Sequence, residues 1–322
     1  MMRFTVLMTA PKLAPKGVKK LTDANCKIIY VNDSTDPQAI LSILSTEPVD
    51  AVISRTMTLT GEAIRACPTL KVITKHGVGV SNIDVDAATE RNIPVLVTPG
   101  TNSQSVAELA LGLMLAAARR IASYDRDLRT GNWSRAGNGQ QLSGRTLGLV
   151  GFGQIGQTLA QFCIALGMKV VAYDPMLKAS PIEQVTLIHD LPALLRQSQV
   201  LSLHCPLVPA TRNLINEEAL SLLPDGAILV NTARGPLIDE SALVAALQSG
   251  KLAGAGLDTF VNEPLPLSDA IASQPTVVMT PHVGGSTPDA LDAMAEHAAD
   301  NVINFLNGKP LSPSLCVNHL IK

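Results

Sequence analysis

Three polar residues able to bind carboxylates or move protons follow short apolar runs in the second half of the chain. Arg234 follows the run 227–231, Glu263 follows 253–258, and His282 follows 277–280. An arginine binds a carboxylate bidentately and keeps its charge, whereas a histidine exchanges a proton near neutral pH and is oriented by a neighbouring carboxylate. Singly, each fits an ordinary surface position. Their joint placement beyond strand ends favours a site that binds a carboxylate and transfers a proton.

A glycine-rich turn between two apolar runs predicts a dinucleotide site. Residues 146–174 read as a strand, the segment GFGQIG opening a helix, and a second strand ending in an acid. Gly151 permits the tight turn, Gly153 lets backbone approach a pyrophosphate at the helix N-terminus, and Gly156 lets helix and strand pack closely. Asp174 is placed to accept both hydroxyls of an adenosine ribose, although it also fits a strand-end turn. A nicotinamide dinucleotide bound at this turn, together with Arg234 and His282, would supply the groups that a hydride-transfer reaction needs.

Length, charge and cysteine usage exclude several classes of protein. The 322 residues suit two domains, whose cores must be aliphatic because aromatic residues make up only 3% of the chain. A net charge of −2, with no basic run, gives no electrostatic footprint for nucleic acid. The five cysteines lack metal-ligand spacing, and there is neither a signal-peptide pattern nor a membrane-spanning apolar run. We therefore expect a soluble, cytoplasmic chain without a metal ion or a membrane partner.

Short apolar runs alternate with helical patterns twice, which predicts two doubly wound parallel sheets. Strands are expected at 4–8, 27–31, 51–54, 72–74 and 95–97, and then from Leu147 and at 170–174, 200–204, 227–231, 253–258 and 277–280. Helices are expected after Thr60, from a cap at Asp239 to Gly250, and from 288 to 306. The tail beyond the last helix is expected to return to the first domain.

Residues 105–129 predict a single long helix, because the stretch is rich in Ala and Leu and contains no Pro. That length is unusual for a domain core. The helix either caps a sheet, or serves as a connector or an arm that packs on a second subunit. The sequence leaves these alternatives open.

Five motifs resemble the D-isomer-specific 2-hydroxyacid dehydrogenase family. They are VGFGQIG (150–156), HCPL (204–207), LVNTARGPLIDESAL (229–243), AGLDTFVNEP (255–264) and TPHVGGST (280–287). The resemblance implies two Rossmann-like domains: a flavodoxin-like split substrate domain at 1–99 and 288–322, and an NAD-binding domain at 100–287. It implies an enzyme that moves a hydride between NAD and a small 2-oxo or 2-hydroxy acid of the hydroxypyruvate, glyoxylate or phosphoglycerate type, and a homodimer built on the NAD-binding domains.

Matching the motifs residue by residue assigns roles within this chain. The resemblance implies that Arg234 binds and polarises the substrate, that His282 transfers the proton, and that Glu263 supports His282. It also implies that Asp258 binds the nicotinamide amide. The other implied cofactor contacts are Gly151, Gly153, Gln154, Ile155, Gly156, Asp174, Cys205, Pro206, Thr232, Ala233, Arg234, His282, Val283, Gly284 and Gly285.

A second glycine-rich segment, HGVGVSNID (76–84), resembles the family's substrate loop. Backbone amides near Val78 and Gly79 would bind the substrate carboxylate, although a plain strand-to-helix turn also fits the glycines. Ser81 stands where many members have Asp. The implied substrate contacts are Arg55, His76, Gly77, Val78, Gly79 and Arg234.

Two further features bear on the substrate. Ile53 stands where some phosphoglycerate dehydrogenases have arginine, which weakens the case for a phosphorylated substrate. The chain also stops soon after the last helix, so we expect no regulatory C-terminal domain.

The two domains are expected to close by bending near 99–100 and 285–288. The alternative functions are an NADH-sensing binding protein of the corepressor type, and a formate or phosphite dehydrogenase.

Overall fold

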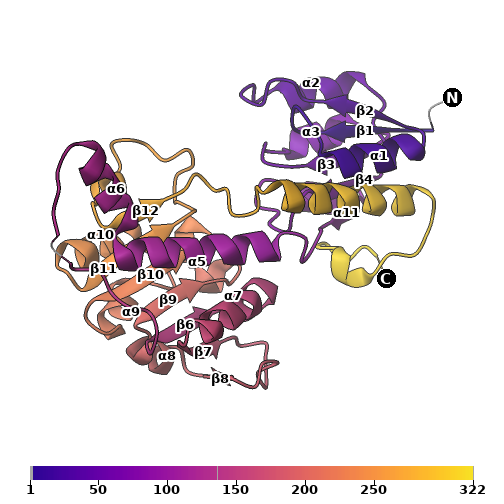
Figure 1. The fold of residues 1–322 in the computed structure, drawn as a ribbon. Helices are drawn as coiled ribbons and strands as arrows, with labels where there is room; N and C mark the ends of the chain where they lie inside the picture. Colours follow the sequence, from indigo (N-terminus) through magenta and orange to yellow (C-terminus); the bar gives the residue numbers. More distant parts are fainter. Residues whose placement is uncertain (1–2, 136, 322) are drawn as a thin grey trace. The chain divides into compact units, whose positions relative to one another are not determined.

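The computed structural model describes residues 3–135 and 137–321. The chain splits into two compact units, one made of residues 1–102 and 286–322 and the other of residues 103–285. Each unit is a parallel β-sheet with helices on both faces (Figure 1). The predicted fold class, two doubly wound α/β sheets, is confirmed.

The first unit holds a five-stranded sheet in the order β2-β1-β3-β4-β5, the flavodoxin-like order. Helices α1 and α11 cover one face, and α2, α3 and α4 cover the other. The strands are β1 (Phe4–Met8), β2 (Cys26–Tyr30), β3 (Ala51–Ser54), β4 (Val72–Lys75) and β5 (Val95–Leu96). The helices are α1 (Pro15–Asp23), α2 (Ala39–Thr46), α3 (Gly61–Ala66), α4 (Val85–Glu90) and α11 (Pro288–Leu306).

Local signals explain where several of these elements begin and end. The Thr60 hydroxyl accepts a hydrogen bond from the Ala63 amide and so starts α3, as predicted. The final helix, predicted at about 288–306, coincides with α11. The tail returns to the first unit, as expected, because the Val97 amide donates to the Leu315 carbonyl and the Val317 amide to that of Val95.

The second unit holds a seven-stranded sheet in the order β12-β11-β10-β9-β6-β7-β8. The order reverses between β6 and β9, which is where doubly wound sheets bind ligands at the carboxyl ends of their strands. Helices α5 and α7 pack on one face, and α8, α9 and α10 on the other (Figure 1). The strands are β6 (Thr146–Val150), β7 (Lys169–Tyr173), β8 (Val185–Leu187), β9 (Val200–Leu203), β10 (Ala227–Asn231), β11 (Leu252–Leu257) and β12 (Val277–Met279). The helices are α5 (Ser103–Arg119), α6 (Ile121–Arg129), α7 (Gln154–Ala165), α8 (Leu191–Gln197), α9 (Glu217–Leu222) and α10 (Glu240–Gln248). Strand β8 was not predicted.

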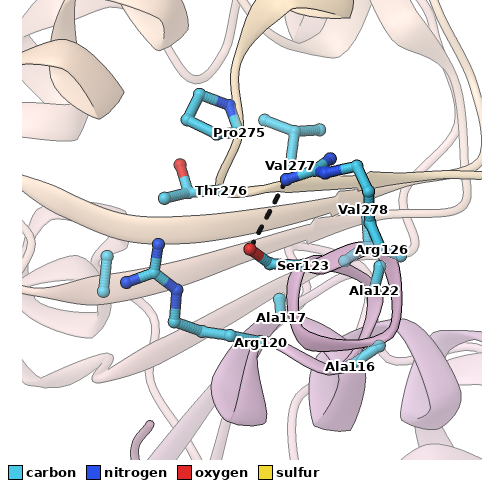
Figure 2. A pocket seen from close by; sticks show the side chains of 11 residues that line it. Ala116, Ala117, Arg120, Ala122, Ser123, Arg126, Pro275, Thr276, Val277 and Val278 are labelled. Carbon is cyan, nitrogen blue, oxygen red and sulfur yellow. Dashed lines mark hydrogen bonds between the residues drawn. The ribbon is translucent and has the colours of Figure 1, made fainter. Parts of the chain in front are cut away.

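The prediction of one continuous helix over 105–129 is wrong. Helix α5 ends at Arg119, and α6 begins at Ile121 after Arg120 adopts a left-handed backbone with φ 54°. At the break, the Gln140 amide donates to the Ala118 carbonyl at 2.7 Å and so satisfies an acceptor that the end of α5 leaves without a helical partner. Figure 2 shows the resulting turn beside the β12 segment, with Ser123 bonded to Arg126.

The described residues contain neither a membrane-spanning helix nor a metal-binding cluster. Across 3–135 and 137–321, none of the helices combines the length and apolar character needed to cross a membrane. The same residues contain no group of three or more His, Cys, Asp or Glu side chains arranged to hold a metal ion.

Candidate active site

Three adjacent strands of the second unit deliver the predicted catalytic residues to one edge of the sheet. β11 lies between β10 and β12, and all three run parallel. The ladder continues past the strand ends, because the Asp258 amide donates to the Asn231 carbonyl and the Thr280 amide to that of Leu257, each at 2.9 Å. The loops carrying Arg234, Glu263 and His282 therefore leave the sheet side by side.

His282 and Glu263 form a direct pair. The imidazole Nδ1 lies 2.8 Å from Glu263 Oε2, and Glu263 Oε1 accepts a hydrogen bond from the Phe260 amide at 3.0 Å. Both side chains are partly exposed, at 45% for the histidine and 37% for the glutamate. A proton on Nδ1 that is donated to the carboxylate leaves Nε2 as the nitrogen that exchanges a proton with a bound ligand.

The loop that carries His282 is fixed by the buried carboxylate of Asp258. Asp258 Oδ1 accepts from the Thr280 hydroxyl at 2.6 Å and the Val283 amide at 2.9 Å, and Oδ2 accepts from the Gly284 amide at 2.8 Å. These bonds bracket His282, whose backbone is left-handed with φ 53°. Asp258 thus holds the histidine in an uncommon backbone conformation.

Arg234 lies in the turn after β10. Burial lowers the pKa of its guanidinium, and the nearby Glu263 carboxylate opposes that shift. The group stays cationic because a guanidinium titrates far above neutral pH. At Gly235 an added Cβ would lie 2.0 Å from the Phe260 carbonyl carbon, so this turn packs directly on the backbone of the Glu263 loop.

The β6–α7 turn has the space and backbone that a dinucleotide pyrophosphate requires. Gly151 has φ 91°, and an added Cβ would lie 2.6 Å from the His204 carbonyl carbon, so a side chain does not fit there. Gly153 caps α7 and has no heavy atom within 4 Å of an added Cβ, which leaves the helix N-terminus open. At Gly156 the added Cβ would lie 2.6 Å from the Gly151 carbonyl oxygen. The turn fits the predicted group.

Asp174 follows β7 directly and faces the same turn. Its Oδ2 accepts from the Phe152 amide at 2.8 Å and its Oδ1 from the Met176 amide at 3.0 Å. Each carboxylate oxygen has two acceptor positions, so one on each remains for a ribose hydroxyl.

Other predicted cofactor residues lie at neighbouring strand ends. Cys205 follows β9, and burial raises the pKa of its thiol to about 11. Thr232 follows β10, and its buried hydroxyl has no hydrogen-bond partner among the described residues. The amides of Val283 and Gly284 are already bound to Asp258, so these two N–H groups are not available to a cofactor. The cofactor contacts assigned to these four residues stay predictions.

The predicted substrate loop belongs to the first unit. Gly77 has φ 129°, and its amide donates to the Thr98 hydroxyl at 3.0 Å. His76 is buried, and its burial, with the positive charge of Arg55, lowers the pKa of the imidazole to about 4. The structure thus brings Arg55 and His76 together, whereas Arg234 belongs to the other unit. Their substrate-binding roles stay predictions.

Sequence reasoning did not assign Asn231, the last residue of β10. Its side chain is fully buried and bonds to both ends of the segment 233–234. The signal available was a polar residue closing an otherwise apolar run directly before the turn.

The comparisons with known proteins agree with this fold. Residues 111–284 match the family described as D-isomer specific 2-hydroxyacid dehydrogenase, NAD binding domain. A hydroxypyruvate reductase of Thermotoga maritima is 43% identical over 288 residues, covering 81% of this chain and 92% of that protein. A D-3-phosphoglycerate dehydrogenase of Mycobacterium tuberculosis is 40% identical over 311 residues, covering 96% of this chain but 58% of that protein.

The similarity extends to solved structures. The TT0316 protein from Thermus thermophilus superposes with a TM-score of 0.88 at 37% identity, covering 97% of this chain and 99% of that one. The chain belongs to the D-isomer specific 2-hydroxyacid dehydrogenases. It is an NAD-dependent oxidoreductase that acts on the CH–OH group of 2-hydroxy acids.

Proposed function

We propose that the chain reduces small, unphosphorylated 2-oxo acids to D-2-hydroxy acids, with hydroxypyruvate as the preferred substrate and glyoxylate as a second. The observation that carries the proposal is the His282–Glu263 pair, held at 2.8 Å on the strand-end edge that also carries Arg234. A cation for the carboxylate and a carboxylate-oriented proton donor are the two groups that this reduction needs from the protein.

The residues divide the reaction between them. When bound, the nicotinamide supplies the hydride that adds to the substrate C2 carbon. Arg234 binds the substrate carboxylate and polarises the carbonyl, because its guanidinium offers several donors in a fixed plane. His282 donates the proton from Nε2 to the carbonyl oxygen as negative charge develops there, and Glu263 stabilises the imidazolium before the transfer. In the oxidative direction His282 takes the same proton back.

The cofactor preference is proposed to be NADH over NADPH. Asp174 has acceptor positions left for a ribose diol, and its negative charge would repel a 2′-phosphate. Initial rates with the two reduced cofactors test this, and a higher kcat/KM with NADPH would refute it. Asp174→Asn removes the negative charge and is expected to reduce the ratio of kcat/KM with NADH to kcat/KM with NADPH.

Two features support an unphosphorylated substrate. Ile53, a buried apolar residue, stands where some phosphoglycerate dehydrogenases have arginine. The similarity to the Thermotoga hydroxypyruvate reductase also spans nearly the whole of that protein.

The test is NADH oxidation with hydroxypyruvate, glyoxylate, pyruvate, bulkier 2-oxo acids and phosphohydroxypyruvate. The highest kcat/KM is expected for hydroxypyruvate. Turnover of phosphohydroxypyruvate alone would overturn the substrate assignment. No turnover of any member would favour an NADH-sensing role, and NAD reduction by formate or phosphite would point to those anions.

We also propose a homodimer built on the second unit and a cytoplasmic location. Helix α6 has no buried residue of its own and presents Ile121 and Leu128 at 54% and 55% exposure, which supports a second copy as its partner. Buried free thiols, such as Cys67 and Cys163, suit a reducing compartment.

A further inference from the structure

The side-chain amide of Asn231 spans the turn that carries Arg234. Its Oδ1 accepts from the Ala233 amide at 3.0 Å, and its Nδ2 donates to the Arg234 carbonyl at 2.8 Å. Asn231 is 0% exposed, so water does not compete for either of these hydrogen bonds. One planar group therefore fixes the backbone on both sides of the arginine Cα.

The backbone of Asn231 is fixed as firmly as its side chain. The residue ends β10, which lies between β9 and β11, and its carbonyl accepts the Asp258 amide at 2.9 Å. Asp258 in turn holds the loop of His282. The backbone of Asn231 is therefore held in place by its neighbouring strands, and its side chain in turn holds the segment that carries Arg234.

Only an amide of this length satisfies both ends of the turn. A serine is too short to span it, a leucine offers no polar atom, and an aspartate places an acceptor opposite the Arg234 carbonyl. The Arg234 Nη1 also donates to the Ala233 carbonyl at 2.6 Å, so the guanidinium position depends on the same two residues that Asn231 clamps.

We propose that Asn231 is a positioning residue for Arg234, setting the backbone of the turn so that the guanidinium is preorganised for the substrate carboxylate. This rests on the proposed role of Arg234. Loss of the clamp lets the turn sample other conformations, and small displacements of a substrate-binding group cost large factors in rate.

The test is a double-mutant cycle made of the parent, Asn231→Ala, Arg234→Ala and the double variant. Two quantities are measured: kcat/KM for hydroxypyruvate at saturating NADH, and the Kd of oxalate, an unreactive planar dicarboxylate, for the NADH-loaded enzyme. Asn231→Ala is expected to lower kcat/KM and weaken oxalate binding by about 10- to 100-fold. In the Arg234→Ala background the same change is expected to cost less than about 3-fold, because the group it positions is gone.

The control is Asn301→Ala. Asn301 is also buried and donates from Nδ2 to the Val97 carbonyl at 3.1 Å, but it lies in the first unit. Asn301→Ala is expected to lower Tm by about as much as Asn231→Ala does, and to leave the Kd of oxalate unchanged. If Asn231→Ala does not fold, the same cycle is run with Asn231→Asp, which keeps the acceptor for the Ala233 amide and replaces the donor to the Arg234 carbonyl with an acceptor.

The outcomes separate the two ideas. Equal losses in both Arg234 backgrounds, or no loss in the parent, would overturn the positioning role and leave the proposed function standing. If Arg234→Ala itself left oxalate affinity and kcat/KM unchanged, the substrate role of Arg234 would fall, and this proposal with it.

Discussion

At the scale of single residues, the proposed reaction depends on how the side chains of His282 and Glu263 are held. His282 is bonded to Glu263 through Nδ1, and its loop is bracketed by the three hydrogen bonds to Asp258. Glu263 is itself held by the Phe260 amide. The imidazole therefore faces a carboxylate whose position is set by the backbone.

Glu263→Gln is expected to move both pH profiles in the same direction. The substitution removes the negative charge that stabilises the imidazolium while keeping a side chain of similar shape. In the proposed mechanism, reduction of the oxo acid needs protonated His282, so the reducing activity of Glu263→Gln should fail at a lower pH than that of the parent. Oxidation needs the neutral form and should begin at a lower pH.

The measurement is kcat/KM against pH in both directions for the parent and Glu263→Gln, with His282→Ala as the reference for full loss of proton transfer. His282→Ala is expected to lower the rate by about 10²–10⁴. Profiles that coincide in both directions would show that Glu263 does not tune His282.

At the scale of elements, two glycines of the β6–α7 turn are expected to have different roles: Gly151 is needed for stability and Gly153 for cofactor binding. Gly151→Ala is expected to lower the unfolding free energy by about 1–3 kcal/mol, because φ is 91° and the new Cβ meets the His204 backbone. Gly153→Ala is expected to leave Tm unchanged, because φ is −74° and no heavy atom lies within 4 Å. It should instead raise the Kd for NADH about 10-fold or more by placing a methyl group before the helix N-terminus.

Thermal unfolding and NADH fluorescence titration measure the two effects on the same pair of variants. Unchanged NADH affinity in Gly153→Ala would mean that the pyrophosphate does not lie at this turn.

Elements whose signals are local were predictable from sequence, and elements set by distant contacts were not. Helix α11 was predicted at about its observed bounds, and its start is local: Thr287 caps it and Pro288 opens it. Strand β8 was missed because it has three residues and pairs at a sheet edge. The break at Arg120 was missed; the carbonyl that it leaves at Ala118 is bonded by the amide of Gln140, a distant contact that no local pattern reveals.

The candidate site follows the same rule. The placement of Arg234, Glu263 and His282 beyond strand ends could be predicted from the sequence, because the carboxyl ends of parallel strands lie along one edge of a sheet. The bonds from Asp258 to the loop of His282 depend on which strands are neighbours and on the turn after β12, so the sequence did not show them.

At the scale of the whole molecule, each unit contains a buried histidine that makes its stability sensitive to acid. Burial lowers the pKa of His76 in the first unit and of His204 in the second to about 4, from an ordinary 6.5. Between these values the unfolded chain binds protons that the folded chain does not. The unfolding free energy is therefore highest above pH 6.5 and should fall as pH drops toward 4, by about 1.4 kcal/mol per pH unit for each histidine.

Urea unfolding at about pH 7 and about pH 5 measures this loss. His76→Gln and His204→Gln should each reduce the difference between the two pH values, whereas His297→Gln, at an exposed position of α11, should not. An equal acid sensitivity in all four proteins would contradict the assignment.

The proposed dimer rests on a surface of the second unit alone. Helix α6 and the loop after it expose Ile121, Leu128 and Trp133, the last at 73%. The adjoining α5–α6 turn lies beside β12, the edge strand of the sheet, with Arg120 and Arg126 in the groove between them (Figure 2). A two-fold pairing of this surface would cover apolar side chains that a monomer leaves in water.

Light scattering at micromolar concentration is expected to give about twice the chain mass of 33.9 kDa. Leu128→Glu should shift the mass toward the monomer, because pairing would bury an unpartnered charge. Leu267→Glu is the matched control, since Leu267 is 98% exposed on a loop of the same unit, away from α6 in the sequence. It should leave the mass unchanged. A monomeric parent, or a Leu128→Glu variant that stays dimeric, would mean that α6 is not the subunit interface.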